Sequence, residues 1–192
     1  MKILIGTNNY NKFNDYKIVF NIFAPKFELL RPKDLNIEDD IEEAGKTLAE
    51  NAILKAKFFG KKSGIITISD DTGLFVDSLN GEPGLHAKRW HNGTEHDRCV
   101  KLLERLKGKD RKAKYIWGFA VYNPKNDKAW VFEHIVEGLI SDEFKNGGFG
   151  YDPIFKLKLM DKYYSQLTDV ELAKIGGRGV AVKELLKSNF LK

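Results

Sequence analysis

The chain has 192 residues, 42% of them apolar, a formal net charge of +5 and a single cysteine, Cys99. This length suits one domain with a sizeable core, so we expect a single domain over residues 1–192. The apolar runs are too short to span a membrane, and a lone cysteine excludes an internal disulfide. We therefore expect a cytoplasmic protein with no membrane partner. Its positive charge favours an anionic ligand, either nucleic acid or a small phosphorylated molecule.

The first residues predict a strand, a turn and a helix. Residues 2–6 are mostly apolar and end at a glycine, and the turn that follows contains Thr7, Asn8, Asn9 and Lys12. A strand followed by a capped helix start presents backbone N–H groups to an anion, which makes this stretch a candidate phosphate site. A helix start without any ligand has the same pattern, and the glycine spacing of a P-loop is absent.

A second helix is predicted from about residue 46 to 61, after an acidic connection over residues 32–43. Thr47, Asn51 and Lys55 recur every four residues and form a polar stripe beside an apolar one. Lys55 therefore lies where it can reach a cleft. The pattern fits equally well a Lys55 side chain that extends from an amphipathic helix into solvent.

Residues 65–76 contain two apolar, strand-like runs separated by Asp70, Asp71, Thr72 and Gly73. This pattern predicts a strand, a tight turn with paired carboxylates, and a second strand. Adjacent acids repel each other unless a cation or a proton lies between them, so the pair indicates a divalent metal or an acid/base role. A solvated Asp-Asp turn is the alternative.

The rest of the chain alternates predicted strands and helices. We expect a strand at residues 27–30, a hairpin turn at 80–81, a helix at 94–106, and a hairpin of two long strands at 115–122 and 129–137. A short helix is expected after Thr168 and a last helix at residues 180–187.

Residues 147–155 are rich in glycine and also contain Phe149, Tyr151 and Asp152. Aromatic faces stack on nucleobases, and a fixed carboxylate accepts hydrogen bonds from base N–H groups. The composition is therefore suited to gripping a flat polar ring. A glycine-rich loop whose aromatic residues anchor it in the core is the alternative.

Taken together, these motifs resemble the inosine-triphosphatase-like family over nearly the whole chain, from Lys2 to about Leu186. The matching residues are Thr7, Asn9 and Lys12; Glu43, Gly45, Thr47, Glu50, Asn51, Ala52 and Lys55; Asp70 to Leu74; Asn80, Gly81, Pro83, Gly84 and Arg89; and residues 148–155.

Members of this family hydrolyse non-canonical purine nucleoside triphosphates, such as ITP, dITP and XTP, to the monophosphate and pyrophosphate. The resemblance implies the α/β fold of the ITPase-like (anticodon-binding-like/ITPase) class. This fold is an elongated, mixed, twisted sheet flanked by helices, with a nucleotide cleft between two lobes. The resemblance also implies a Mg²⁺ cofactor and a homodimer, and it gives no reason to expect a nucleic acid partner.

The resemblance further implies a role for each matching residue. The residues that would hold the triphosphate are Thr7, Asn8, Asn9 and Lys12. Lys55 would act with Asp71 in catalysis, and Glu43 and Asp71 would bind Mg²⁺. The residues that would contact the rest of the substrate are Thr72, Phe149, Gly150, Tyr151, Asp152 and Arg178, with the Phe149 ring stacked on the base.

The carboxyl-terminal part departs from the family pattern. Leu172, Gly176 and Gly177 stand where the family has a base-facing lysine, serine and histidine, and only Arg178 remains. Fewer hydrogen-bond donors around the base predict relaxed or redirected base selectivity. An alternative of another class is a non-catalytic or altered-specificity nucleotide-binding protein of the same fold. A general nucleic-acid binder, argued only from the net charge, is the third hypothesis.

Overall fold

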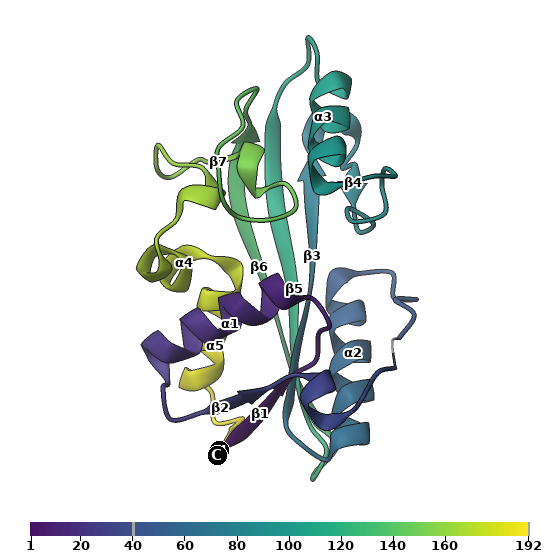
Figure 1. Cartoon of the computed structure of the whole chain (residues 1–192), viewed down its shortest axis with the longest axis vertical. Coiled ribbons are helices and arrows are strands. Elements are labelled where there is room, and N and C mark those ends of the chain that lie inside the picture. Colours follow the sequence, from purple (N-terminus) through teal and green to yellow (C-terminus); the bar gives the residue numbers. More distant parts are fainter. Residues whose placement is uncertain (40, 192) are drawn as a thin grey trace. The chain divides into compact units, whose positions relative to one another are not determined.

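The computed structural model describes residues 1–39 and 41–191, so Asp40 of the acidic connection lies outside the described residues. The chain forms two compact units, called unit 1 and unit 2 below (Figure 1). Unit 1 comprises Met1–Asp71, Trp117–His134 and Asp169–Lys192, and unit 2 comprises Thr72–Ile116 and Ile135–Thr168. Strands β3, β5 and β6 each run from one unit into the other. The single domain over residues 1–192 stays a prediction.

The strands form one mixed sheet in the order β2-β1-β3-β5-β6-β7, with β4 paired to β3. Strand β1 is parallel to β2 and β3, whereas β4 is antiparallel to β3 and β7 is antiparallel to β6. The bounds are β1 Lys2–Ile5, β2 Glu28–Leu30, β3 Thr67–Val76, β4 Pro83–Gly84, β5 Lys112–Asn123, β6 Lys128–Ile140 and β7 Phe155–Leu157. The predicted α/β fold with a mixed sheet is confirmed. The cleft between two lobes stays a prediction.

Capping side chains decide where the helices begin. Asn9 caps the first helix, Thr47 caps the second through the N–H of Glu50, and Thr94 and Asp97 form a capping box on the third. The helices are α1 Tyr10–Phe23, α2 Leu48–Ser63, α3 Glu95–Arg105, α4 Asp169–Ile175 and α5 Gly177–Lys187, and the short 3-10 helices are Pro32–Leu35, Asp77–Leu79, Asp152–Ile154 and Tyr164–Gln166. Within the described residues, none of these helices is long and apolar enough to cross a membrane.

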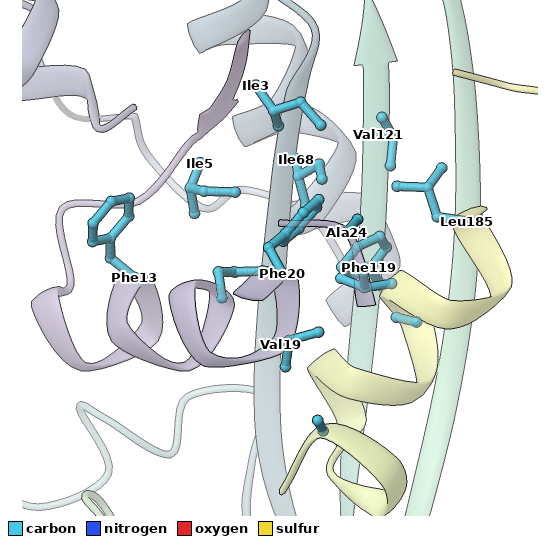
Figure 2. Packing of buried hydrophobic residues seen from close by; sticks show 14 residues of the cluster. Ile3, Ile5, Phe13, Val19, Phe20, Ala24, Ile68, Phe119, Val121 and Leu185 are labelled. Atoms are coloured by element: carbon cyan, nitrogen blue, oxygen red, sulfur yellow. The ribbon is translucent and has the colours of Figure 1, made fainter. Parts of the chain in front are cut away.

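The core of unit 1 follows the period of two that places alternate residues of a strand on opposite faces. Ile3, Ile5 and Ile68 pack with α1 and α5, as Figure 2 shows, whereas Leu4 packs with Phe59 of α2. Strand β5 alternates in the same way: Phe119 and Val121 face α1 and α5, and Ala120 and Tyr122 face α2. Both faces of the sheet are therefore buried in unit 1, and each face is lined by a different set of helices.

The predicted turn at Asp70–Gly73 is wrong, because these residues lie inside the continuous strand β3. Ile68 pairs with β1 before the acids, and Leu74 pairs with β4 after them. Pairing on both sides keeps the backbone extended through residues that, by composition, suggest a turn.

The last helix begins three residues earlier than predicted. Gly177, Arg178 and Gly179 form the first turn of α5 instead of a loop, and all three are buried. Helix α4 ends at Ile175, as the glycines predict. Arg178 is therefore held by a helix that packs against α1 and α4.

Candidate active site

A close contact between β1 and β3 positions the turn that precedes α1. The N–H of Gly6 donates to the carbonyl of Ile68 at 2.7 Å, and Ser69 Oγ donates to the carbonyl of Gly6 at 3.0 Å. A Cβ atom on Gly6 would lie 2.4 Å from Ser69 Oγ, so only glycine allows this approach. The turn therefore begins beside the part of β3 that contains Asp70 and Asp71.

The turn itself is ordered by its own side chains. Asn9 Oδ1 accepts from the N–H groups of Asn11 at 2.9 Å and Lys12 at 3.3 Å, and Thr7 Oγ1 accepts from the N–H of Asn9 at 3.2 Å. Asn8 is exposed. The capped helix start predicted from the sequence is confirmed, whereas its role as a phosphate site stays a prediction.

Asp70 lies on the α1 and α5 face of β3, where it is 2% exposed and surrounded by donors. Arg178 Nη2 lies 2.9 Å from Asp70 Oδ2, and Arg178 Nε donates to Asp70 Oδ1 at 3.3 Å. Lys12 Nζ lies 3.0 Å from Oδ2, and the Tyr16 hydroxyl donates to Oδ1 at 2.9 Å. Arg178 also binds Asp15 through Nη1 at 2.8 Å. Asp70 is thus part of a buried network of ion pairs.

Asp71 lies on the opposite, α2 face of the same strand. Asn51 Nδ2 donates to Asp71 Oδ2 at 3.0 Å, and Lys55 Nζ donates to Asp71 Oδ1 at 3.3 Å. The same ammonium group donates to Glu43 Oε1 at 2.8 Å, and the N–H of Gly45 donates to Asn51 Oδ1 at 2.8 Å. Of the two alternatives for Lys55, the structure supports the inward one, because this lysine bridges two carboxylates instead of extending into solvent.

Burial and neighbouring charges shift the pKa values of these groups in different directions. Burial by itself would raise the pKa of Asp70, but the charges of Arg178 and Lys12 outweigh it and hold that pKa well below its usual range. Burial lowers the pKa of Lys12 by more than the charge of Asp70 raises it. Burial also acts to lower the pKa of Lys55, yet the charges of Asp71 and Glu43 leave it above the ordinary value. The pKa of Lys55 therefore favours an ammonium ion at neutral pH.

The chemistry available on the α2 face follows from these contacts. A lysine that remains charged neutralises oxyanions, and a carboxylate beside it accepts a proton from water or binds a hard cation. Lys12, on the other face, contributes a second ammonium group close enough for Lys55 to influence its pKa. Such a set is suited to phosphate groups. Thr72, the next residue of β3 after Asp71, is half-buried and begins unit 2.

The loop at residues 147–155, which is predicted to bind a base, lies in unit 2 and is held by hydrogen bonds to residues of that unit. Asp152 accepts from the N–H of Phe149 at 3.0 Å and from the Tyr115 hydroxyl at 2.9 Å. Tyr151 is buried and donates to the carbonyl of Ala87 at 3.1 Å. The N–H of Gly150 donates to a carboxylate oxygen of Glu95 at 2.9 Å. Tyr151 and Asp152 therefore anchor the loop, while the Phe149 side chain is half-buried.

Several residues that organise these sites were given no site role from the sequence. On unit 1 they are Asp15, Tyr16 and Asn51, and on unit 2 they are Glu95 and Tyr115. Asn51 shares the helical stripe of Lys55, which was a usable signal. The others gave no such signal, because a tyrosine in an apolar pattern and an acid within a helix have ordinary structural explanations.

The fold and the site define an α/β protein whose strand β3 carries a cluster of charged side chains on each face. The chain belongs to the Ham1 family, whose sequence model matches residues 3–188. This match, together with the relatives below, confirms the family predicted from the motifs.

Similar curated proteins carry the name dITP/XTP pyrophosphatase. One from Thermoanaerobacter pseudethanolicus is 40% identical over 198 residues, covering 100% of this chain and 98% of the relative. One from Staphylococcus aureus is 35% identical over 188 residues, covering 96% of this chain and 94% of the relative. Among solved structures, the Staphylococcus aureus Ham1 protein matches with a TM-score of 0.82 at 35% identity, and a HAM1 protein from Coxiella burnetii with a TM-score of 0.83 at 30% identity; each alignment covers 97% of both chains.

Proposed function

We propose that this protein hydrolyses non-canonical purine nucleoside triphosphates, namely ITP, dITP and XTP, to the nucleoside monophosphate and pyrophosphate. The names of relatives that match the chain over nearly its whole length support this reaction. The observation that carries it is the position of Lys55 Nζ, 2.8 Å from Glu43 Oε1 and 3.3 Å from Asp71 Oδ1. A cation and two hard oxygen donors meet there on one face of a buried strand.

The proposed reaction needs a water molecule that attacks the α-phosphorus and a pyrophosphate that leaves. Asp71 accepts the proton of that water as general base, and Lys55 neutralises charge on the phosphate oxygens. Asn51 fixes the orientation of the Asp71 carboxylate through its hydrogen bond. No covalent intermediate is required, because positioning and charge neutralisation supply most of the rate in phosphoryl chemistry.

The turn before α1 holds the triphosphate in this proposal, through Thr7, Asn8, Asn9 and Lys12. The Lys12 ammonium group and the helix N-terminus are both suited to phosphate oxygens. Thr72 supplies a hydroxyl to the substrate, and Phe149 and Gly150 contact the base. Tyr151 and Asp152 act there through the loop that they anchor.

The donor set fits a divalent metal ion. Mg²⁺ is typically bound by one or two carboxylates together with substrate phosphates and water. Glu43 and Asp71 supply two carboxylates that both accept hydrogen bonds from Lys55. Within the described part of the chain, no group of three or more His, Cys, Asp or Glu residues could hold a metal, so its other ligands would come from phosphate and water. When bound, such an ion neutralises phosphate charge and polarises the attacked phosphorus.

Pyrophosphate release from dITP, XTP, GTP and ATP, with and without Mg²⁺, tests the proposal. We expect Mg²⁺-dependent turnover that prefers dITP or XTP, with one pyrophosphate formed per monophosphate. Binding of these nucleotides without any turnover would support the non-catalytic alternative instead. The homodimer and the cytoplasmic location predicted from the sequence belong to the same proposal, and sedimentation equilibrium of the purified protein tests the dimer.

A further inference from the structure

Phe149 lies between two glycines whose backbones adopt left-handed conformations. Gly148 has a φ of 68° and Gly150 a φ of 64°, a region that residues with a Cβ atom rarely adopt. Apart from its chain neighbours, the described residues leave open space within 4 Å of a Cβ atom on Gly150, so conformation and not crowding favours glycine there. Glycine loses more conformational freedom than any other residue when it is fixed, so this segment keeps one conformation only if its backbone groups are bound.

Two groups of side chains hold the backbone around Phe149. Asp152 Oδ2 accepts from the N–H of Phe149 at 3.0 Å, and the N–H of Asp152 donates to the carbonyl of Phe149 at 3.2 Å. At the next residue, Glu95 Oε2 accepts from the N–H of Gly150 at 2.9 Å, and Cys99 Sγ donates to the carbonyl of Gly150 at 3.3 Å. The peptide groups on both sides of the Phe149 Cα atom are therefore bound, by the loop itself and by α3.

Glu95 and Cys99 are four residues apart, so they lie on one face of α3. The capping box of Thr94 and Asp97 determines where this helix begins, and Glu95 is its first residue. The Glu95 carboxylate is therefore presented to the loop by an ordered helix end. Cys99 is 1% exposed, whereas Glu95 is exposed, so the Glu95 contact can be changed without disturbing the core.

We propose that Glu95 is a positioning residue for base binding, which holds the Gly150 peptide and thereby keeps the Phe149 ring in place for stacking. This inference rests on the proposed function, because that function assigns the base to Phe149. Stacking on an aromatic ring tolerates every base. Glu95 therefore contributes to the binding of all the nucleotides alike and makes no contribution to the binding of inorganic tripolyphosphate, which has no base.

Three substitutions separate this role from that of an acid that stabilises the helix start. Glu95→Gln keeps an oxygen acceptor without the charge, Glu95→Asp keeps the charge but is one methylene shorter, and Glu95→Ala loses both. We expect KM for dITP and GTP to rise about fivefold in Glu95→Asp and Glu95→Ala and less than about twofold in Glu95→Gln. The kcat values should stay within about twofold of the wild type, because the contact is uniform in the ground and transition states.

A role confined to the helix end would group the variants differently. Glu95→Gln would then match Glu95→Ala, and Glu95→Asp would match the wild type; that grouping, or an unchanged KM in Glu95→Ala, would overturn the inference. Glu104→Ala is the matched control, because Glu104 lies on the same helix and pairs with Lys101 at the surface. Glu95→Asp carries the test if Glu95→Ala does not fold.

Binding of inorganic tripolyphosphate, measured by calorimetry, tests whether the effect is confined to the base. Its affinity should stay within about twofold of the wild type in every Glu95 variant. A tripolyphosphate affinity that falls as far as the dITP affinity would show a general disturbance of the protein and would contradict the proposal.

Amide hydrogen exchange, followed by NMR of the labelled protein, tests the contact without any substrate. The Gly150 N–H should exchange about fivefold faster in Glu95→Ala and Glu95→Asp than in the wild type, and Glu95→Gln should resemble the wild type. Equal exchange in all four proteins would show that Glu95 does not hold the loop. If the wild type hydrolyses none of the triphosphates, the proposed function fails, while exchange and calorimetric binding of dITP still decide the role of Glu95.

Discussion

Asp70 and Asp71 are consecutive residues of β3 whose carboxylates lie on opposite faces of the sheet. Asp70 binds Arg178 of α5 at 2.9 Å, and Asp71 binds Lys55 of α2 at 3.3 Å. The two acids therefore form ion pairs with different cations. Each is held by a different helix, so the two should respond differently to substitution: Asp71 belongs to the chemistry, and Asp70 to the network that positions Lys12.

Asp71→Asn should abolish most turnover and leave the fold intact. The amide removes the base and a hard metal ligand, whereas its oxygen still accepts the hydrogen bond from Asn51. We expect kcat for dITP to fall at least about 100-fold, with a small change in Tm. Turnover within about tenfold of the wild type, which is about 1.4 kcal/mol in barrier height, would contradict the assignment.

Lys55→Met should lower kcat by about tenfold or more and change Tm by only a few degrees. The rate falls because phosphate oxygens lose their ammonium partner. The loss of stability stays small because Glu43 is partly exposed and Asp71 keeps its hydrogen bond from Asn51. Lys62→Met is the matched control, since Lys62 lies on the same helix and pairs with the exposed Asp39. A large fall in Tm with unchanged kcat would show that Lys55 is structural.

Gly177→Ala should destabilise the protein, although alanine favours helices over glycine. A Cβ atom at this position would lie 2.2 Å from Cδ2 and 2.6 Å from Cε2 of the Trp117 indole. Overpacking of this kind typically costs about 1–3 kcal/mol. Thermal unfolding measures the loss, and Trp117→Leu in the same chain should recover part of it. Equal stability of Gly177→Ala and the wild type would contradict the packing.

The same contact determines how base selectivity can be tested. A histidine at position 177 would meet Trp117, so the family's histidine cannot be restored without rearranging the core. Leu172→Lys is the usable change, because Leu172 is only half-buried in α4. It should raise the kcat/KM ratio of ITP or XTP over GTP about tenfold if the added donor reaches the base.

Val170→Lys is the control for this experiment. This substitution adds a lysine at an exposed position of the same helix. It therefore reproduces the change in charge without placing an ammonium group at position 172. A ratio that stays the same in Leu172→Lys, or rises equally in both variants, would show that position 172 does not set base choice.

Cys99 should be chemically inert in the folded protein. The thiol is 1% exposed, and burial raises its pKa to about 12. The thiolate is the reactive form, so at pH 8 only about one molecule in ten thousand is reactive. A coloured thiol reagent should therefore label Cys99 only after unfolding in guanidinium. Labelling of the native protein at the rate of a small free thiol would contradict this.

Local patterns in the sequence were sufficient for most of the secondary structure of unit 1. The buried residues of the first helix, Phe13, Tyr16, Val19 and Phe20, recur at the three- and four-residue spacing of one helix face. Asn9 and Thr47 cap the two helices that they precede. These features depend on residues within one or two turns of each other, so periodicity and capping determine them before any tertiary contact forms.

Only the tertiary structure determined that the side chains of Asp70 and Asp71 lie on opposite faces of the sheet. Their composition suggested a turn, but pairing of β3 with β1 and β4 extends the backbone through them, and the pleat then separates their side chains. The sequence also did not indicate that Asp70 pairs with Arg178, because Arg178 lies 108 residues further along the chain. Sequence motifs placed Lys55 and Asp71 in one family pattern. Only the folded chain showed that Lys55 bridges Asp71 and Glu43. It also showed that Lys12 and Arg178 both pair with Asp70. Contacts between distant segments depend on how helices pack on the sheet, and no local pattern encodes that packing.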